Sequence, residues 1–202
     1  MAYPTVSAPY GLQPINRVDG MPYAGAIRQI PITASYGTAI YNGDVVQLVV
    51  GGTVEKSTVT TNVEAQPTLG VLVGCQYTNS SGQTVQAQYY PTGVTNAVAY
   101  VVLDPQAAYK VAVTTSGNTS VVTSVTRAVV GTNMEIATGA GNATTGDSGL
   151  SVVSGSAANT AVLPVRVVDV VPETAINATA FREVIVKLNQ PQFEVTTGNN
   201  AS

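Results

Sequence analysis

Short runs of β-branched residues, separated by turn residues, fill most of the sequence after Tyr36. Valine, isoleucine and threonine carry two heavy substituents on Cβ, which stiffens the side chain and favours a pleated strand over a helix. Runs of this kind that recur every eight to twelve residues or so, roughly one strand and one turn each, are typical of all-β proteins. The sequence therefore predicts an all-β fold.

The clearest local signal is a hairpin. The runs DVVQLVV (residues 44–50) and TVEKSTV (residues 53–59) flank Gly51-Gly52, and two glycines between two such runs are typical of a tight turn. Incomplete alternation of apolar and polar residues indicates strands buried on both faces, as in a β-sandwich or a β-barrel. Further strands are expected at TLGVLVGCQY, TVQAQYY, AVAYVVL, AYKVAV, SVVTSVTRAVV, LSVVS, AVLPVRVVDVV and REVIVKL.

The core of this fold has to be built mainly from aliphatic side chains. Hydrophobic residues make up 45% of the 202 residues but aromatic residues only 6%, and there is no Trp. Cys75 has no second cysteine to pair with, so it is expected to pack as a small hydrophobe. The expected core members include Val45, Leu48, Val71, Val73, Val101, Val165, Val167, Ile185 and Val186.

Proline and tyrosine set the first 35 residues apart from the rest. Prolines at this density exclude a helix and remove donors from a strand ladder, which leaves an extended path. We expect an extended N-terminal arm over residues 1–35, a β-rich body over residues 36–190, and a C-terminal tail over residues 191–202 whose last segment, TTGNNAS, is disordered. Asp104-Pro105 interrupts the body and would separate two small β lobes if the body is divided.

The tyrosines of this arm need an apolar surface that an isolated extended segment cannot supply. The protein's own sheet or a neighbouring molecule could supply it, and the sequence leaves both open. In the second case, deleting the arm should leave a folded body that has lost its partner. The candidate partner-binding residues are Tyr3, Pro4, Pro9, Tyr10, Pro14 and Tyr23.

The charge pattern excludes several classes of partner. Charged residues are 9% of the chain, with a net charge of −3, against a usual charged fraction of about a quarter. Without a cluster of Lys and Arg, we expect no nucleic-acid partner and no acidic membrane surface as partner. The longest apolar run, AVAYVVL, is too short to span a bilayer, and MAYPTVSAPYG does not resemble a secretory signal, so synthesis in the cytoplasm is expected.

One run looks like part of an active site. Gly146-Asp147-Ser148-Gly149 contains the four residues that surround the nucleophilic serine of trypsin-like proteases. Such a serine needs a base, but the chain has no histidine, and Lys56, Lys110 and Lys187 do not have the Ser-x-x-Lys spacing. The run is therefore interpreted as a tight turn, and Ser148→Ala is expected to leave assembly and particle stability unchanged.

Cofactor sites are not indicated by the sequence. The eleven carboxylates are scattered, and no glycine-rich phosphate or dinucleotide motif is present, so we expect no zinc, iron, copper or nucleotide cofactor and no enzymatic activity. The run GAGNATTGD (residues 139–147) resembles a calcium-binding loop only in its glycines, and a calcium site between loops is left open.

The segments APYGLQPINRVDGMPYAGAIRQIPI, YGTAIYNGDVVQLVVGGTV, LGVLVGCQYTN, AYVVLDPQAAYKV and VIVKLNQPQF resemble a family of virion structural proteins of tailed bacteriophages from aquatic environments. The resemblance extends from Ala8 to Phe193. The order of the elements at residues 43–46, 52–56 and 69–71 is also similar to that of small head-decoration proteins. No catalytic residues accompany either resemblance.

This resemblance implies a capsid decoration, or cement, protein on the outer head surface, with the major capsid protein as partner and a homo-oligomeric state. An extended arm could add to the sheet edges of a neighbouring subunit, and many copies on one shell would gain avidity. The alternative is a receptor-binding module of a tail fibre or adhesin. Its aromatic sugar platform would have to be Tyr89-Tyr90, because the chain has no Trp.

Overall fold

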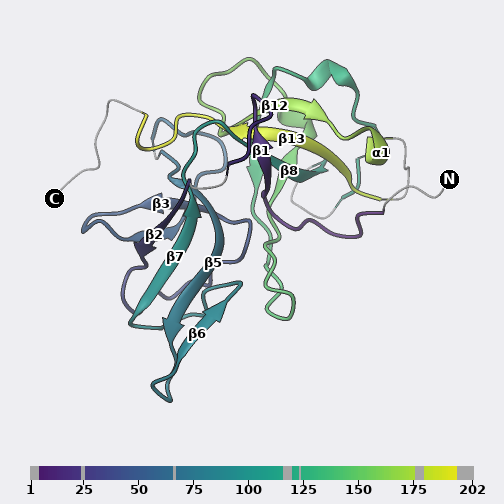
Figure 1. The fold of residues 1–202 in the computed structure, drawn as a ribbon. Coiled ribbons are helices and arrows are strands. Elements are labelled where there is room, and N and C mark those ends of the chain that lie inside the picture. Colours follow the sequence, from purple (N-terminus) through teal and green to yellow (C-terminus); the bar gives the residue numbers. More distant parts are fainter. Residues whose placement is uncertain are drawn as a thin grey trace.

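The computed structural model describes residues 5–23, 26–65, 67–115, 120–122, 124–175 and 180–194, and the structural statements below concern these residues. Their fold is all-β, as the β-branched runs predict, and consists of two mostly antiparallel sheets (Figure 1). One sheet nearly closes into a barrel, and the second packs beside it. Helical structure in this part of the chain is limited to η1 (Arg127–Val129), η2 (Ser154–Ser156) and α1 (Pro172–Ala175).

The first sheet follows the order β10-β11-β8-β13-β12-β9, with β1 added to β8. Its two end strands, β9 and β10, are separated in the chain only by Glu135, so the sheet comes close to closing on itself. Its strands are β1 (Gln13–Arg17), β8 (Ala107–Thr114), β9 (Asn133–Met134), β10 (Ile136–Ala137), β11 (Ser151–Val153), β12 (Val165–Val170) and β13 (Arg182–Leu188).

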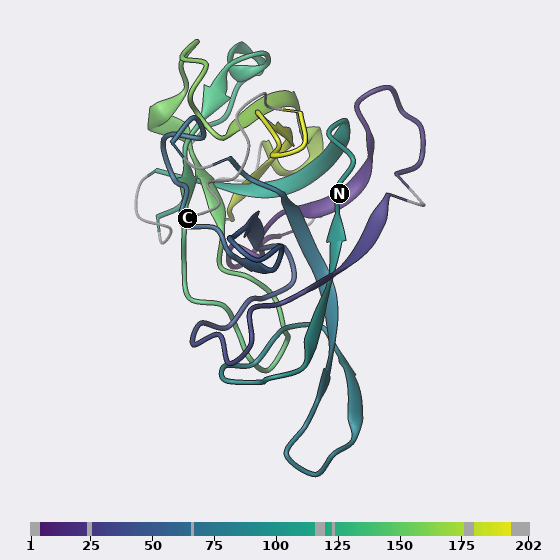
Figure 2. The same ribbon diagram turned by 90° about the vertical axis from the view of Figure 1, so that its left-hand side faces the viewer.

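The second sheet follows the order β2-β7-β5-β3-β4, with β6 added to β5. A parallel bridge between Ile32 and Val54 brings the chain just after β2 back to β4. The β5–β6 hairpin extends away from the rest of the molecule in Figure 2. The strands are β2 (Ile27–Pro31), β3 (Val45–Leu48), β4 (Val54–Lys56), β5 (Gly70–Thr78), β6 (Thr84–Ala87) and β7 (Ala97–Val102).

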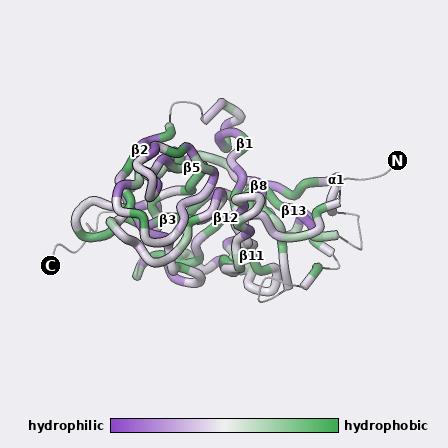
Figure 3. The backbone as a smooth tube through the Cα atoms, turned by 90° about the horizontal axis from the view of Figure 1, so that it is seen from below, coloured by the Kyte–Doolittle hydropathy of each residue, from purple (hydrophilic) through white to green (hydrophobic). Residues whose placement is uncertain are grey.

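The core consists of two clusters of mainly aliphatic side chains, and the first cluster contains residues from both sheets. Val45, Val71 and Val102 belong to the second sheet but pack in the same cluster as the valines of β8, β12 and β13. Figure 3 shows hydrophobic and hydrophilic positions interspersed along the strands. Of the expected core residues, three are only partly buried, namely Leu48, Val73 and Ile185, and six are buried, namely Val45, Val71, Val101, Val165, Val167 and Val186.

Cys75 lies in the second cluster with none of its surface exposed. Burial raises the pKa of its thiol to about 11, so the group is neutral at physiological pH. The prediction that Cys75 packs as a small hydrophobe is confirmed.

The N-terminal segment is extended, as predicted, but it is not an arm separate from the body. β1 pairs with β8, and β2 pairs with β7 over its whole length. Edge strands tolerate proline because one side of the ladder needs no donor, and Pro14 and Pro31 both lie in such strands. The boundary expected after residue 35 is therefore wrong, because both sheets take a strand from this segment.

Other local expectations also need correction. The run SVVTSVTRAVV is not a strand in its described residues, although Val122 and Val125 are buried, because it forms only a bridge at Val121 and the turn η1. The hairpin loop has three residues rather than two, since Val49 N donates to Thr53 O. The body was expected to end at residue 190, but residues 191 and 192 are also buried. The segment TTGNNAS, expected to be disordered, lies outside the described residues.

The chain passes from the second sheet to the first between Val102 and Ala107. Asp104-Pro105 lies in this connection, where the sequence suggested a division of the body. The division is incomplete, because β1 precedes all strands of the second sheet in the chain and yet belongs to the first sheet.

Candidate functional site

The residue that most resembles a nucleophile, Ser148, is buried, with 2% of its surface exposed. Its Oγ donates to Asp44 Oδ1 at 2.6 Å and accepts from the Leu150 N–H at 3.0 Å. Asp44 also accepts from the Tyr41 N–H at 2.8 Å and lies 2.9 Å from Lys56 Nζ. Every group in this Ser148 cluster is engaged inside the protein, so the serine joins the β3–β4 hairpin to the segment before β11.

The tight turn lies just before Ser148. Gly146 has φ of +81°, and its N–H donates to Asn142 O at 2.7 Å. Gly149 has a different constraint, because a Cβ there would lie 2.4 Å from Ala140 O. The turn predicted for residues 146–149 is therefore shifted. The Ser148 hydroxyl also donates to the buried Asp44 carboxylate, so the effect of Ser148→Ala on stability stays a prediction, and the structure gives a reason to expect a loss.

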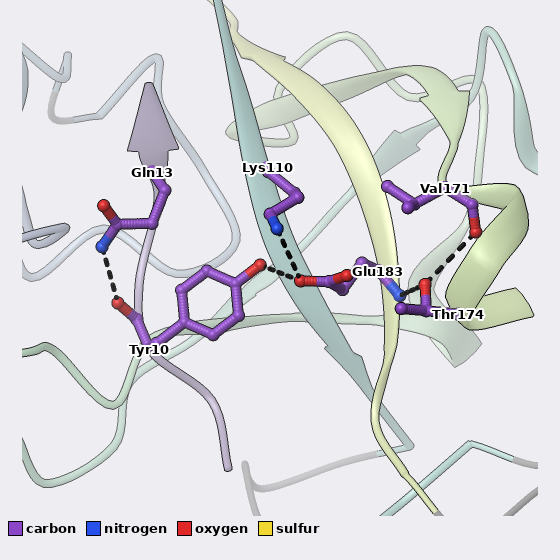
Figure 4. A network of polar contacts seen from close by, with 6 residues as sticks. All are labelled: Tyr10, Gln13, Lys110, Val171, Thr174 and Glu183. Atoms are coloured by element: carbon purple, nitrogen blue, oxygen red, sulfur yellow. Dashed lines mark hydrogen bonds and ion pairs between the residues drawn. The ribbon is translucent and has the colours of Figure 1, made fainter. Parts of the chain in front are cut away.

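A second polar cluster fixes the N-terminal segment on the first sheet (Figure 4). The Tyr10 hydroxyl donates to Glu183 Oε1, and Lys110 Nζ lies 3.3 Å from the same oxygen. The Glu183 side chain is 4% exposed and that of Lys110 is 40% exposed. Glu183 therefore holds one cation and one phenol from two other elements.

Hydrogen bonds between side chains and backbone groups orient this Tyr10 cluster. The Glu183 N–H donates to Thr174 Oγ1 at 3.1 Å, and that hydroxyl donates to Val171 O at 3.2 Å. On the other side, Gln13 Nε2 donates to Tyr10 O at 3.2 Å. The three elements that meet at Glu183 are thus held in one arrangement.

Electrostatics keep the Tyr10 phenol neutral. Burial raises the pKa of Tyr10 first, and the hydrogen bond to Glu183 and the charge of that carboxylate raise it further. Lys110 Nζ also lies 5.8 Å from the centroid of the Tyr10 ring, within range of a cation–π contact. The phenol can therefore act as a permanent donor to Glu183.

A hollow of about 620 Å³ lies beside these two clusters. Its lining contains one ammonium group, Lys110, and two carboxylates, Asp147 and Glu183, together with residues 5–10. No group of three His, Cys, Asp or Glu side chains that could hold a metal ion occurs in the described part of the chain. In the loop GAGNATTGD, Asn142 Oδ1 accepts from the Thr144 N–H at 2.9 Å, so this oxygen is used within the turn.

The structure places the predicted partner-binding residues mostly against the protein itself. Tyr10 contacts Glu183, Tyr23 packs against the first core cluster, and Pro14 lies opposite Tyr109. Pro9 is half-buried. Tyr3 and Pro4 lie outside the described residues. Binding of a partner by these six residues stays a prediction, but Tyr23 does find an apolar surface on its own protein, and Tyr10 finds a polar partner there.

Exposed apolar residues form a candidate contact surface that the sequence reasoning missed. They lie between residues 15 and 27, in the segment that stands out on one side of the ribbon in Figure 2. No single strand pattern groups them in the sequence, because two of them lie in the strands β1 and β2 and the other two lie in the connection between these strands. They are Ile15, Val18, Met21 and Ile27, with 41%, 42%, 59% and 44% of their surface exposed.

The loop that carries Val18 and Met21 is held in place by hydrogen bonds. The Arg17 N–H donates to Met21 O at 2.8 Å, and the Val18 N–H donates to Gln106 O at 2.8 Å. The Met21 N–H donates to Asp19 Oδ1 at 3.0 Å. The exposed side chains are therefore presented by an ordered loop.

The Tyr89-Tyr90 pair does not form an exposed aromatic platform. Tyr90 is fully buried, and its hydroxyl donates to carbonyl oxygens of Tyr36 and Val94. The Tyr89 ring stacks on Tyr41 with a centroid distance of 5.1 Å and an interplanar angle of 13°. The pair holds loops together, so the sugar platform expected at these positions is wrong for Tyr90.

No family model, no curated protein and no solved structure matches this chain. In the part of the chain described here, no helix is long and apolar enough to cross a membrane.

Proposed function

We propose that the protein is a decoration protein of a bacteriophage virion, made in the host cytoplasm, that binds the outer surface of the head. It stabilises the shell through contacts with the major capsid protein and has no enzymatic role. The observation that carries this proposal is the ordered loop with exposed Val18 and Met21, which lies in the chain between the exposed residues Ile15 and Ile27. The resemblance of the sequence from Ala8 to Phe193 to phage virion proteins supplies the identity of the shell.

The concentration of these residues is the reason to propose a contact. Single exposed apolar residues are normal on a protein surface, whereas a group of them marks an interaction site. Of six large apolar residues that are exposed among the described ones, four lie within residues 15–27, and the other two are Val50 and Phe193. A neighbouring subunit that covers this segment would remove its apolar surface from water.

The charges around the segment fit a neutral partner surface. Arg17 lies 3.0 Å from Asp104 and 3.6 Å from Asp19, so the charge of Arg17 is compensated within the protein. Exposed ion pairs contribute little to affinity and are screened by salt. Binding by apolar contact should therefore be nearly insensitive to salt, and repetition over the capsid lattice would raise the avidity of a weak contact.

The experiment that tests this function is localisation of the protein on purified virions by antibody labelling and electron microscopy. Labels at lattice sites over the whole head are expected. Labels confined to the tail would contradict the proposal and support a fibre protein. No label on intact virions, with the protein present only in infected cells, would exclude both.

A further inference from the structure

A second hollow, of about 320 Å³, lies in the second sheet where β2 and β5 end and β7 begins. None of its lining residues belongs to the Ser148 cluster or the Tyr10 cluster, and in the described part of the chain none of them is charged. Its polar side chains are Gln76, Thr78, Thr95 and Asn96, and the rest of the lining is mainly apolar. Pockets with an apolar lining and a few polar groups, from about 300 Å³ upward, are typical of small-molecule sites.

One face of the sheet connects this hollow to an aromatic ring, Tyr100. Val98 lines the hollow and precedes Tyr100 by two residues on β7, so the two side chains point to the same face. Gln76 lies opposite Val98, and Gln86 lies opposite Gln76. Tyr100, Gln76 and Gln86 therefore share a face of β7 and of the β5–β6 hairpin, which extends from the molecule in Figure 2.

A glycine lets the Tyr100 ring lie close to the neighbouring strand. Gly74 lies opposite Tyr100 on β5, and a Cβ there would lie 3.6 Å from Tyr100 Cδ2. The Tyr100 side chain is nevertheless half-buried rather than buried, so part of it faces solvent. Its position combines an apolar ring with a polar hydroxyl, as is common where proteins bind ligands that have both kinds of surface.

Hydrogen bonds hold the two glutamine side chains beside this ring. The Tyr100 hydroxyl can donate to Gln76 Oε1 at 3.1 Å or to Gln86 Oε1 at 3.0 Å. Gln86 Nε2 donates to Gln76 Oε1 at 2.8 Å. Gln76 Nε2 has no partner among the described residues, so its two hydrogens are available to a ligand. Because both amides are already held in place, a ligand would lose less affinity in ordering them.

We propose that this hollow, with Tyr100 beside it, binds an uncharged saccharide of one or two hexose units. Sugar hydroxyl groups both donate and accept, which suits the Gln76 and Asn96 amides and the threonine hydroxyls, while the C–H face of a sugar ring suits the Tyr100 ring. Phosphates and acidic sugars are recognised mainly by charged donors, which the described lining lacks. The proposal does not depend on binding to a capsid.

An NMR titration of the full, 15N-labelled chain tests the site. The probes are the neutral disaccharides maltose, cellobiose, lactose and chitobiose. At least one of them should shift the side-chain amide signals of Gln76 and Asn96 in a saturable way. Tyr100→Ala, which removes the ring, and Gln76→Ala, which removes the free amide, should each weaken binding of that disaccharide about tenfold.

Gln83→Ala is the matched control, because Gln83 is an exposed glutamine of the same hairpin that does not line the hollow. It should bind like the wild type, and circular dichroism of all variants checks that the sheets are intact. The proposal is overturned if none of the disaccharides binds, if the shifted signals lie outside the hollow, or if folded Tyr100→Ala and Gln76→Ala bind like the wild type. Since the titration uses no virion, its outcome is independent of the proposed capsid function.

Discussion

Residues 5–14 and residues 15–31 both belong to the Pro- and Tyr-rich segment, yet they contact the rest of the protein in different ways. In the first half, Leu12 is fully buried, and the Gly11 and Leu12 N–H groups donate to Leu150 O at 3.1 Å and to Gly43 O at 2.9 Å. The second half exposes Val18 and Met21. The proline and tyrosine content identifies the whole segment as able to bind a surface. Only the contacts in the structure show that residues 5–14 are already bound to the rest of the protein.

The largest effect is expected from deleting residues 1–30. If the segment packed only against a partner, such a deletion would leave a folded body, but the structure contradicts this condition. The deletion removes β1, four of the five residues of β2 and the buried Leu12. The deleted protein should show no cooperative unfolding transition in urea. A cooperative transition with a native circular dichroism spectrum would mean that the segment is an arm after all.

A single substitution in the first half tests the same point more finely. Leu12→Ala removes a fully buried side chain and should lower the free energy of unfolding by about 2–5 kcal/mol, through lost transfer energy and a cavity. Denaturant titration of the two proteins measures the difference. Ile15→Ala in the exposed strand position is the control, and equal stability of both variants would erase the distinction between the halves.

The Ser148 cluster lies directly under the first half, because a Cβ on Gly11 would lie 2.8 Å from Ser148 Cβ. Ser148→Ala should lower the free energy of unfolding by about 1–3 kcal/mol, since the buried Asp44 carboxylate loses a donor. Thr144→Ala, an exposed hydroxyl in the neighbouring turn, should have little effect. If Ser148→Ala unfolds like the wild type, the Ser148 hydroxyl does not contribute to stability, as the turn interpretation from the sequence implied.

High pH should weaken the buried parts of the molecule. The folded pKa of Cys75 is raised from 9.0 to about 11, so its stabilising contribution is complete below pH 9 and is lost as pH rises toward 11. The pKa of Tyr10 is raised as well, so its contribution falls over an alkaline range in the same direction. Urea titrations at pH 7 and above pH 10 should show this decline, and a smaller decline in Cys75→Ala. Equal declines in both proteins would contradict the assigned pKa of the thiol.

The fold class and much of the core could be predicted from the sequence because the signal is local. Most valine runs form the strands that they predict, and Val45, Val71 and Val167 are buried as expected. The edge strands β1 and β2 could not be predicted in this way. Their prolines argue against a strand, and only the position of each strand at a sheet edge makes those prolines acceptable.

The clusters at the candidate site were beyond prediction for a different reason. Ser148 and Asp44 are 104 residues apart in the sequence, and Tyr10 and Glu183 are 173 apart. The two sheets bring these residues together, and no spacing in the sequence encodes that topology. The short run around Ser148 therefore suggested either an active site or a turn, and the residue that decides its role, Asp44, lies in another part of the chain.

The smallest effect on stability is expected from Val18→Ser combined with Met21→Ser. This double variant also gives the most direct test of the proposed contact with the capsid. Both side chains are exposed, so the free energy of unfolding should change by less than about 0.5 kcal/mol. The decisive measurement is binding of this variant and of the wild type to capsids that lack the protein, at low and high salt. The wild type should bind at both salt concentrations, Val50→Ser should bind like it, and the double variant should lose most of its binding. Full binding by the double variant, or loss of wild-type binding at high salt, would contradict a contact made by these apolar side chains.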